Sequence, residues 1–94
     1  MKIMISQPMH GKTEKQIKEE REELVRKLQE EGHEVLDTIF EFDCYVSPIY
    51  YLAKSIEVLD KADAVIFMKG WEKARGCIIE HETALKYNKY IKEL

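Results

Sequence analysis

Two kinds of hydrophobic segment alternate along the chain. Short apolar runs are typical of strands, and the run DAVIFM at 63–68 contains so few polar residues that we expect a sheet covered on both faces. Between these runs lie charged segments whose apolar residues recur at helical spacing and form one face, as at 17–28. In chain order, the pattern predicts a strand at 1–6, a helix at 14–31, a strand at 33–37, a helix at 48–61, a strand at 63–68, a helix at 75–87 and a strand at 89–93.

Boundary signals support the first two helices. Thr13 followed by Gln16 matches a capping box, and Ser47 followed by Pro48 matches an N-cap with proline at the first helical position. The segment 38–46 has no clear period, so it is either a loop that carries aromatic residues or an extension of the second strand.

The alternation of strands and helices predicts one α/β domain that spans residues 1–94. Right-handed crossovers would give a small doubly wound, flavodoxin- or Rossmann-like parallel sheet of four to five strands with flanking helices. In such sheets, ligands bind beyond the carboxyl ends of the strands. We therefore expect the loops SQPMHGKT (6–13) and KGWEKARG (69–76) to border a common cleft.

Composition narrows the classes of function. The 94 residues include 15 Lys and Arg against 18 Asp and Glu, for a net charge of −3, which argues against a nucleic-acid-binding surface. Cys44 and Cys77 have no metal-ligand spacing and are expected to be free thiols. No signal peptide or membrane span is evident, so we expect a cytoplasmic protein without membrane contact. We also expect no bound metal and no cofactor.

The loop SQPMHGKT ends like a phosphate-binding P-loop. That motif needs a first glycine where this chain has Ser6, and Pro8 removes one backbone amide from the cradle. The length of the chain also hardly accommodates a nucleoside triphosphatase. The loop is better interpreted as the wall of a site for a sugar or a phosphate.

Glu80 is the leading candidate for chemistry. Cys77 and Ala84 lie three residues before it and four after it, so Glu80 shares a helix face with small residues. A partly desolvated carboxylate there suits a nucleophile or a general base, and the alternative is an ordinary solvated glutamate. Gly76 would let a ligand approach the amides at the helix start, or would serve packing against the sheet.

Other polar and aromatic residues leave alternatives open. His10 could bind a phosphate or a sugar hydroxyl, or be merely exposed. His81 points about 100° away from Glu80 around the helix, which favours a packing or surface role. The aromatic residues could stack on a base or belong to the core or an interface, and they are Phe40, Phe42, Tyr45, Tyr50, Tyr51 and Trp71.

Three segments carry a resemblance to a known family. They are the opening strand with SQPMHGKT, LDKADAVIF at 59–67 and ARGCIIEHETA at 74–84. Together they resemble the nucleoside 2-deoxyribosyltransferase superfamily, and nearly the whole chain is similar to a small bacterial and phage branch of it. In that superfamily a Gly-x-x-x-Glu helix start supplies the nucleophile, which Gly76 to Glu80 match.

The resemblance implies cleavage or transfer of the N-glycosidic bond of a nucleoside or nucleotide, with Glu80 attacking the anomeric carbon. It also implies a set of substrate-binding candidates, namely Ser6, Gln7, Pro8, Met9, His10, Gly11, Lys12, Ser55, Gly70, Trp71, Arg75 and Gly76. Relatives that hydrolyse nucleoside monophosphates carry an arginine near the position of His10.

Two departures from the pattern favour an alternative function. Ser55 stands where relatives have an aspartate that assists the leaving base, and the chain stops at Leu94, where relatives often complete a neighbouring subunit's pocket. The alternative is a non-catalytic protein that binds a nucleotide or a nucleotide-derived signal. Apolar residues on the second helix, Tyr50, Tyr51 and Leu52, lead us to expect a homodimer or larger homo-oligomer.

Overall fold

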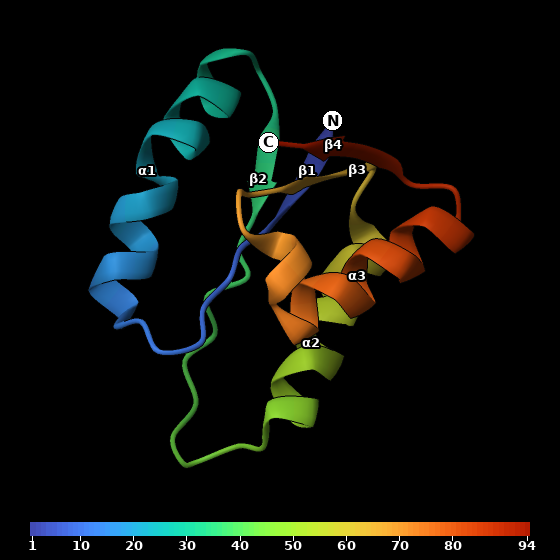
Figure 1. Ribbon diagram of the computed structural model, residues 1–94. Coiled ribbons are helices and arrows are strands. Elements are labelled where there is room, and N and C mark those ends of the chain that lie inside the picture. The colour runs from blue at the N-terminus through green and yellow to red at the C-terminus, as the bar shows by residue number, and fades with distance from the viewer.

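A four-stranded parallel sheet organises the computed structural model, which describes residues 1–94 (Figure 1). Its elements in chain order are β1 (Lys2–Ser6), α1 (Glu14–Glu30), β2 (Glu34–Leu36), α2 (Pro48–Lys61), β3 (Ala64–Phe67), a 3₁₀ turn (Trp71–Lys73), α3 (Arg75–Lys86) and β4 (Tyr90–Glu93). Every helix and strand expected from the sequence is present. The segment 38–46 forms no strand, which settles that open alternative in favour of a loop.

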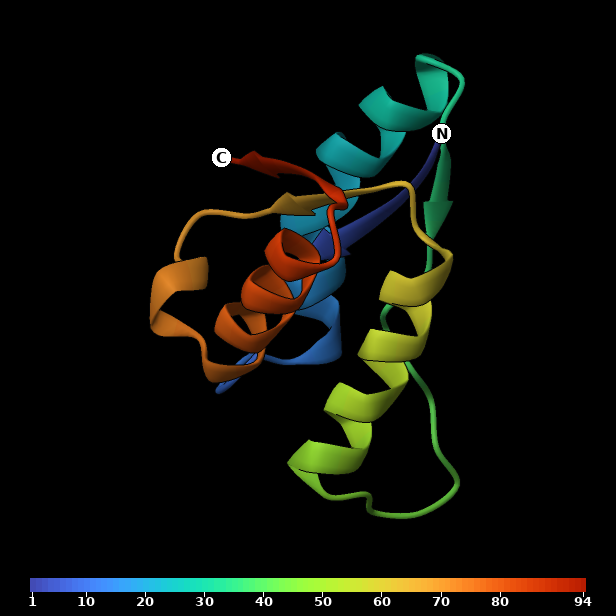
Figure 2. The ribbon, with the colours of Figure 1, turned by 90° about the vertical axis from the view of Figure 1, so that its right-hand side faces the viewer.

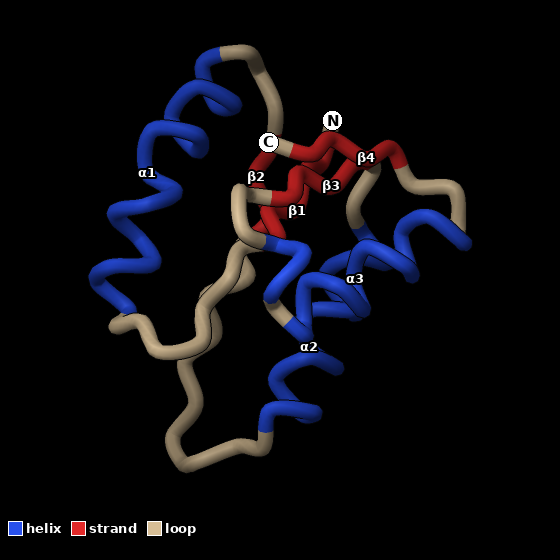
Figure 3. Tube along the Cα trace, in the orientation of Figure 1, coloured by secondary structure: helices blue, strands red, loops and turns tan.

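The strand order is β2-β1-β3-β4, so β1 and β3 form the centre of the sheet. Their register pairs Met4 with Val65 and Ser6 with Phe67, which brings both strands to an end at the same edge. The strands form one layer with α1 on one face and α2 with α3 on the other (Figure 3). This arrangement confirms the predicted doubly wound α/β fold.

Strand alternation divides the core between the two faces of the sheet. Ile3 and Ile5 of β1 pack with Leu28 of α1 on one face. Met4, between them in sequence, packs with Leu59 of α2 on the other face. Figure 2 shows α2 and α3 lying together against this second face. The central strands are therefore covered on both sides, as the apolar run in β3 predicts.

Side-chain caps fix the starts of α1 and α2. Thr13 Oγ1 accepts a hydrogen bond from the Gln16 amide at 3.1 Å, and Gln16 Oε1 accepts one from the Thr13 amide at 2.8 Å, which completes the predicted capping box. Ser47 Oγ accepts from the Tyr50 amide at 3.1 Å, and Pro48 occupies the first turn of α2. The sequence signals for both boundaries are confirmed.

Both cysteines are free thiols, with Cys44 exposed and Cys77 buried. No helix has the length and apolar character needed to cross a membrane. No group of three or more His, Cys, Asp or Glu side chains is arranged to hold a metal ion.

Candidate functional site

A cavity of about 880 Å³ opens where the carboxyl end of β1 meets the amino end of α3. Its walls come from the segments 5–10, 47–55 and 73–80, together with Thr38. The cleft therefore lies beyond the carboxyl edge of the sheet, where the fold class places ligands. A second hollow, of about 700 Å³, runs along α1 and is lined almost entirely by charged and polar side chains.

Glu80 lies in the wall of the first cavity and is only 6% exposed. Ser6 Oγ, at the end of β1, donates a hydrogen bond to Glu80 Oε1 at 2.6 Å. Burial raises the pKa of the Glu80 carboxyl, and the hydrogen bond from Ser6, together with the nearby Ser55 hydroxyl, partly opposes the rise. The side chain is therefore not the solvated glutamate of the alternative interpretation.

Two further small polar side chains lie beside this carboxyl group. Cys77 is one turn earlier on α3, and burial, with a smaller contribution from Glu80, raises the pKa of its thiol. Ser55 comes from α2 and donates to the Tyr51 carbonyl oxygen at 3.4 Å, while lying close enough to Glu80 to affect its pKa. The hydroxyls of Ser6 and Ser55 and the thiol of Cys77 are uncharged. Glu80 forms no ion pair, so it has no charged partner.

The start of α3 presents free backbone amides to the same cavity. Ala74 caps the helix without any side-chain hydrogen bond, and the first turn contains no acidic residue. Outside the backbone of its own helix and its chain neighbours, the nearest atom to a Cβ placed on Gly76 would be Leu52 Cδ1, at 4.0 Å. Packing therefore does not require glycine here, which favours the interpretation that Gly76 leaves room for a ligand.

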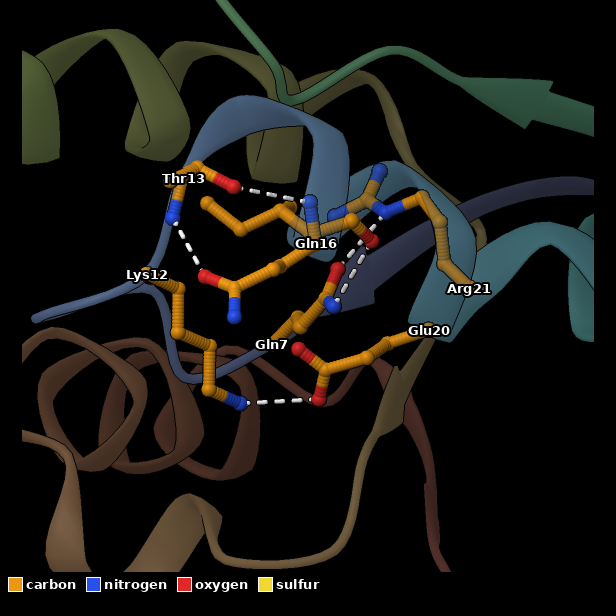
Figure 4. Close-up of polar contacts among 7 residues, drawn as sticks. Gln7, Lys12, Thr13, Gln16, Glu20 and Arg21 are labelled. Atoms are coloured by element: carbon orange, nitrogen blue, oxygen red, sulfur yellow. Dashed lines mark hydrogen bonds and ion pairs between the residues drawn. The ribbon is translucent and has the colours of Figure 1, made fainter.

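A buried polar network supports the first loop, and Figure 4 shows the part of it that joins Gln7 to Arg21. Arg21 Nε donates to Gln7 Oε1 at 2.7 Å, and Gln7 Nε2 donates to the Ile17 carbonyl oxygen at 3.0 Å. Arg21 Nη2 donates to Thr38 Oγ1 at 3.1 Å, and Thr38 in turn donates to the Ile5 carbonyl oxygen at 3.3 Å. The network therefore fixes the Gln7 amide at the cavity wall.

Sequence reasoning missed Arg21 and Thr38. Arg21 is 5% exposed and forms no ion pair with a carboxylate; burial lowers the pKa of its guanidinium, with Asp37 and Tyr51 opposing. The available signal was its position on α1, four residues after Ile17 and three before Leu24, inside the apolar stripe. A charged residue on a buried helix face needs polar partners, and that requirement pointed to a network.

Eight of the twelve expected substrate-binding residues line the cavity, and they are Ser6, Gln7, Pro8, Met9, His10, Ser55, Arg75 and Gly76. Lys12 lies outside and forms an ion pair with Glu20 at 2.8 Å, as Figure 4 shows. Gly11 and Gly70 also lie outside, and both adopt positive φ angles, of 76° and 93°. These two glycines therefore serve turns in their loops.

Trp71 also lies outside the cavity. Its ring stacks on His81 at 4.1 Å between centroids, and His81 Nε2 contacts Glu93 Oε2 at 2.6 Å. Of the aromatic residues considered from the sequence, Tyr51 alone lines the cavity, and its hydroxyl donates to the Thr38 carbonyl oxygen at 3.0 Å. Lys73 is a lining residue that sequence reasoning did not single out.

The fold and the site define a small doubly wound α/β protein with one buried carboxylate in a cleft at the carboxyl edge of its sheet. The chain belongs to the family described as Domain of unknown function (DUF4406), whose family model matches residues 1–93. No curated protein matches the chain.

Proposed function

We propose that the protein cleaves or transfers the N-glycosidic bond of a nucleoside or nucleotide, with Glu80 as the nucleophile. The observation that carries this proposal is the buried Glu80 carboxyl group, which Ser6 holds by one oxygen at the wall of an 880 Å³ cavity. The resemblance of the segment from Gly76 to Glu80 to the superfamily's Gly-x-x-x-Glu start supports the same chemistry.

The environment of Glu80 suits this reaction. Cleavage of a glycosidic bond develops positive charge on the sugar, and a carboxylate that lacks a cationic protein partner interacts most strongly with that charge. The Ser6 hydrogen bond to Oε1 orients the carboxylate and leaves Oε2 to attack the anomeric carbon. Water or a second base would then release the sugar from the resulting ester.

Two positively charged side chains in the lining suit a phosphate group on the same substrate. They are Lys73 and Arg75, and the unpaired amides at the start of α3 can also donate hydrogen bonds to an anion. We therefore include nucleoside 5′-monophosphates among the proposed substrates.

A specific observation favours the alternative of a non-catalytic binding protein. The lining contains no second carboxyl group, and Ser55 cannot protonate a departing base as an aspartate would. A protein of this kind would hold a nucleotide in the same cavity without turnover.

The test is to incubate the protein with nucleosides and their 5′-monophosphates and to measure free base by chromatography. We expect release that is lost, by at least about a hundredfold in kcat/KM, in Glu80→Gln. Glu82→Gln is the matched control, because Glu82 lies on the same helix with an exposed side chain paired to Lys86. Thermal stabilisation by a nucleotide without release of base would contradict catalysis and support the binding protein.

A further inference from the structure

The cavity contains one carboxyl group, which limits how a leaving group could be protonated there. Enzymes that break glycosidic bonds generally use two carboxyl groups, one at the anomeric carbon and one that protonates the leaving group. Glu80 is the only Asp or Glu among the 20 residues that line the cavity. If Glu80 is the nucleophile, no second carboxylic acid is present to protonate a departing base.

The other titratable side chains of the lining do not replace that acid. The Cys77 thiol is buried, and the Tyr51 hydroxyl is already hydrogen-bonded to the Thr38 carbonyl oxygen. Lys73 and Arg75 flank the start of α3, where they suit a phosphate group. His10 is exposed on the first loop, where no protein group orients its ring toward Glu80.

We propose, on the basis of the glycosidic chemistry inferred for Glu80, that the substrate is an N-glycoside whose base already carries a positive charge, such as a pyridinium nucleoside or its 5′-phosphate. A cationic base needs no proton in order to leave. The electron pair of the C1′–N bond neutralises the ring nitrogen, while Glu80 Oε2 forms an ester bond to C1′. Water then hydrolyses the ester, which regenerates the carboxylate and releases one proton to solvent.

Electrostatics favours the same class of substrate. The Glu80 carboxylate is buried without a cationic partner, so a positively charged ring in the cavity offsets part of its desolvation cost. Once the bond breaks, the neutral ring loses this attraction and can leave.

The lining residues also indicate where such a ring would lie. Tyr51 and Leu52 reach the cavity from α2, whereas Lys73 and Arg75 surround the amides at the start of α3. An aromatic ring attracts a cation on its face, and basic side chains attract a phosphate. We therefore place the cationic base against α2 and the phosphate against α3.

The experiment compares two substrate series on the full chain. The first contains nicotinamide riboside and nicotinamide mononucleotide, and the second contains adenosine, deoxyadenosine and their 5′-monophosphates. For each compound, the rate acceleration is the catalysed rate divided by the uncatalysed rate. We expect this acceleration to be at least about tenfold higher for the pyridinium series, because those bonds break without acid catalysis. Glu80→Gln should abolish this release, and the matched control Glu82→Gln should retain it.

The pH dependence of kcat provides a second measurement. Without a protonating group, the rate should rise as Glu80 ionises and then remain constant at higher pH. Equal or faster acceleration for the neutral bases, with a bell-shaped pH profile, would overturn this inference and leave the glycosidic function intact. Failure to release base from either series would overturn both proposals.

Discussion

Glu80 shows how a single buried side chain can lower the stability of a fold. The folded protein keeps its carboxyl group almost entirely away from water, and the hydrogen bond from Ser6 only partly compensates. A desolvated carboxylate of this kind is common at functional sites, because an uncharged side chain would be more stable at the same position.

The first prediction concerns the pH dependence of stability. The folded-state pKa of Glu80 is raised above that of the unfolded chain, so its ionised form is destabilising. The contribution of Glu80 to the free energy of unfolding is therefore greatest at acid pH. It decreases as the pH rises from the pKa of Glu80 in the unfolded chain through its higher pKa in the folded protein. Glu80→Gln should therefore increase the free energy of unfolding at neutral pH by about 1 kcal/mol.

Urea denaturation across the acid-to-neutral range checks this expectation. The gain from Glu80→Gln should disappear at acid pH, where the carboxyl group is protonated in both states. Glu82→Gln changes an exposed carboxyl group on the same helix and should show no such dependence. An equal gain at every pH would mean that the ionisation of Glu80 is not its cause.

At the scale of elements, α1 does more than cover the sheet. Its buried Arg21 links the first loop to Thr38, so the helix fixes two walls of the cavity that are 31 residues apart in sequence, at Gln7 and Thr38. A guanidinium can make both bonds at once because its donors lie in a rigid planar fork.

Arg21→Ala should lower the free energy of unfolding by about 3 kcal/mol, because it leaves buried oxygens of Gln7 and Thr38 without donors. Arg21→Lys should recover only part of this loss, since one ammonium group cannot reproduce the planar fork. Arg26→Ala is the control, because Arg26 is exposed on the same helix and pairs only with Glu30. Equal effects at the two positions in urea denaturation would show that the network contributes nothing.

The elements themselves were predictable because their signals are local. Three signals depend on residues within a few positions of one another. They are the spacing of apolar residues, the Thr13 capping box of α1 and the Ser47-Pro48 start of α2. The cavity was only partly predictable. Ser6 and Glu80 follow from the loop rule and the helix pattern, whereas the Tyr51 hydroxyl bond to the Thr38 carbonyl depends on the path of an irregular loop that no period describes.

At the scale of the whole molecule, exposed apolar side chains gather near the start of α2. Tyr45, Ile49 and Tyr50 are exposed, and the ring of Phe42 contacts that of Tyr50 with centroids 5.7 Å apart. Tyr51 and Leu52, which the sequence suggested as part of this surface, are half-buried and line the cavity instead. An apolar surface of this kind favours contact with a second copy of the chain.

Light scattering at micromolar concentration should therefore give the mass of a dimer or a larger homo-oligomer. The double variant Tyr45→Ser with Tyr50→Ser should shift the protein toward the monomer, because it removes exposed apolar area from this surface. Tyr87→Ser is the matched control, since Tyr87 is an exposed tyrosine at the end of α3. A monomeric mass for the unaltered chain would contradict the prediction.

The contact between Ser6 and Glu80 joins residues 74 positions apart. During synthesis on the ribosome, the strand that carries the serine emerges long before the helix that carries the carboxyl group. Long-range contacts of this kind form only after the intervening chain has collapsed, so the oriented acid exists only in the finished fold. A nascent chain whose α3 has not yet packed against β1 therefore lacks the Ser6–Glu80 contact, and any property that depends on this contact requires the completed fold.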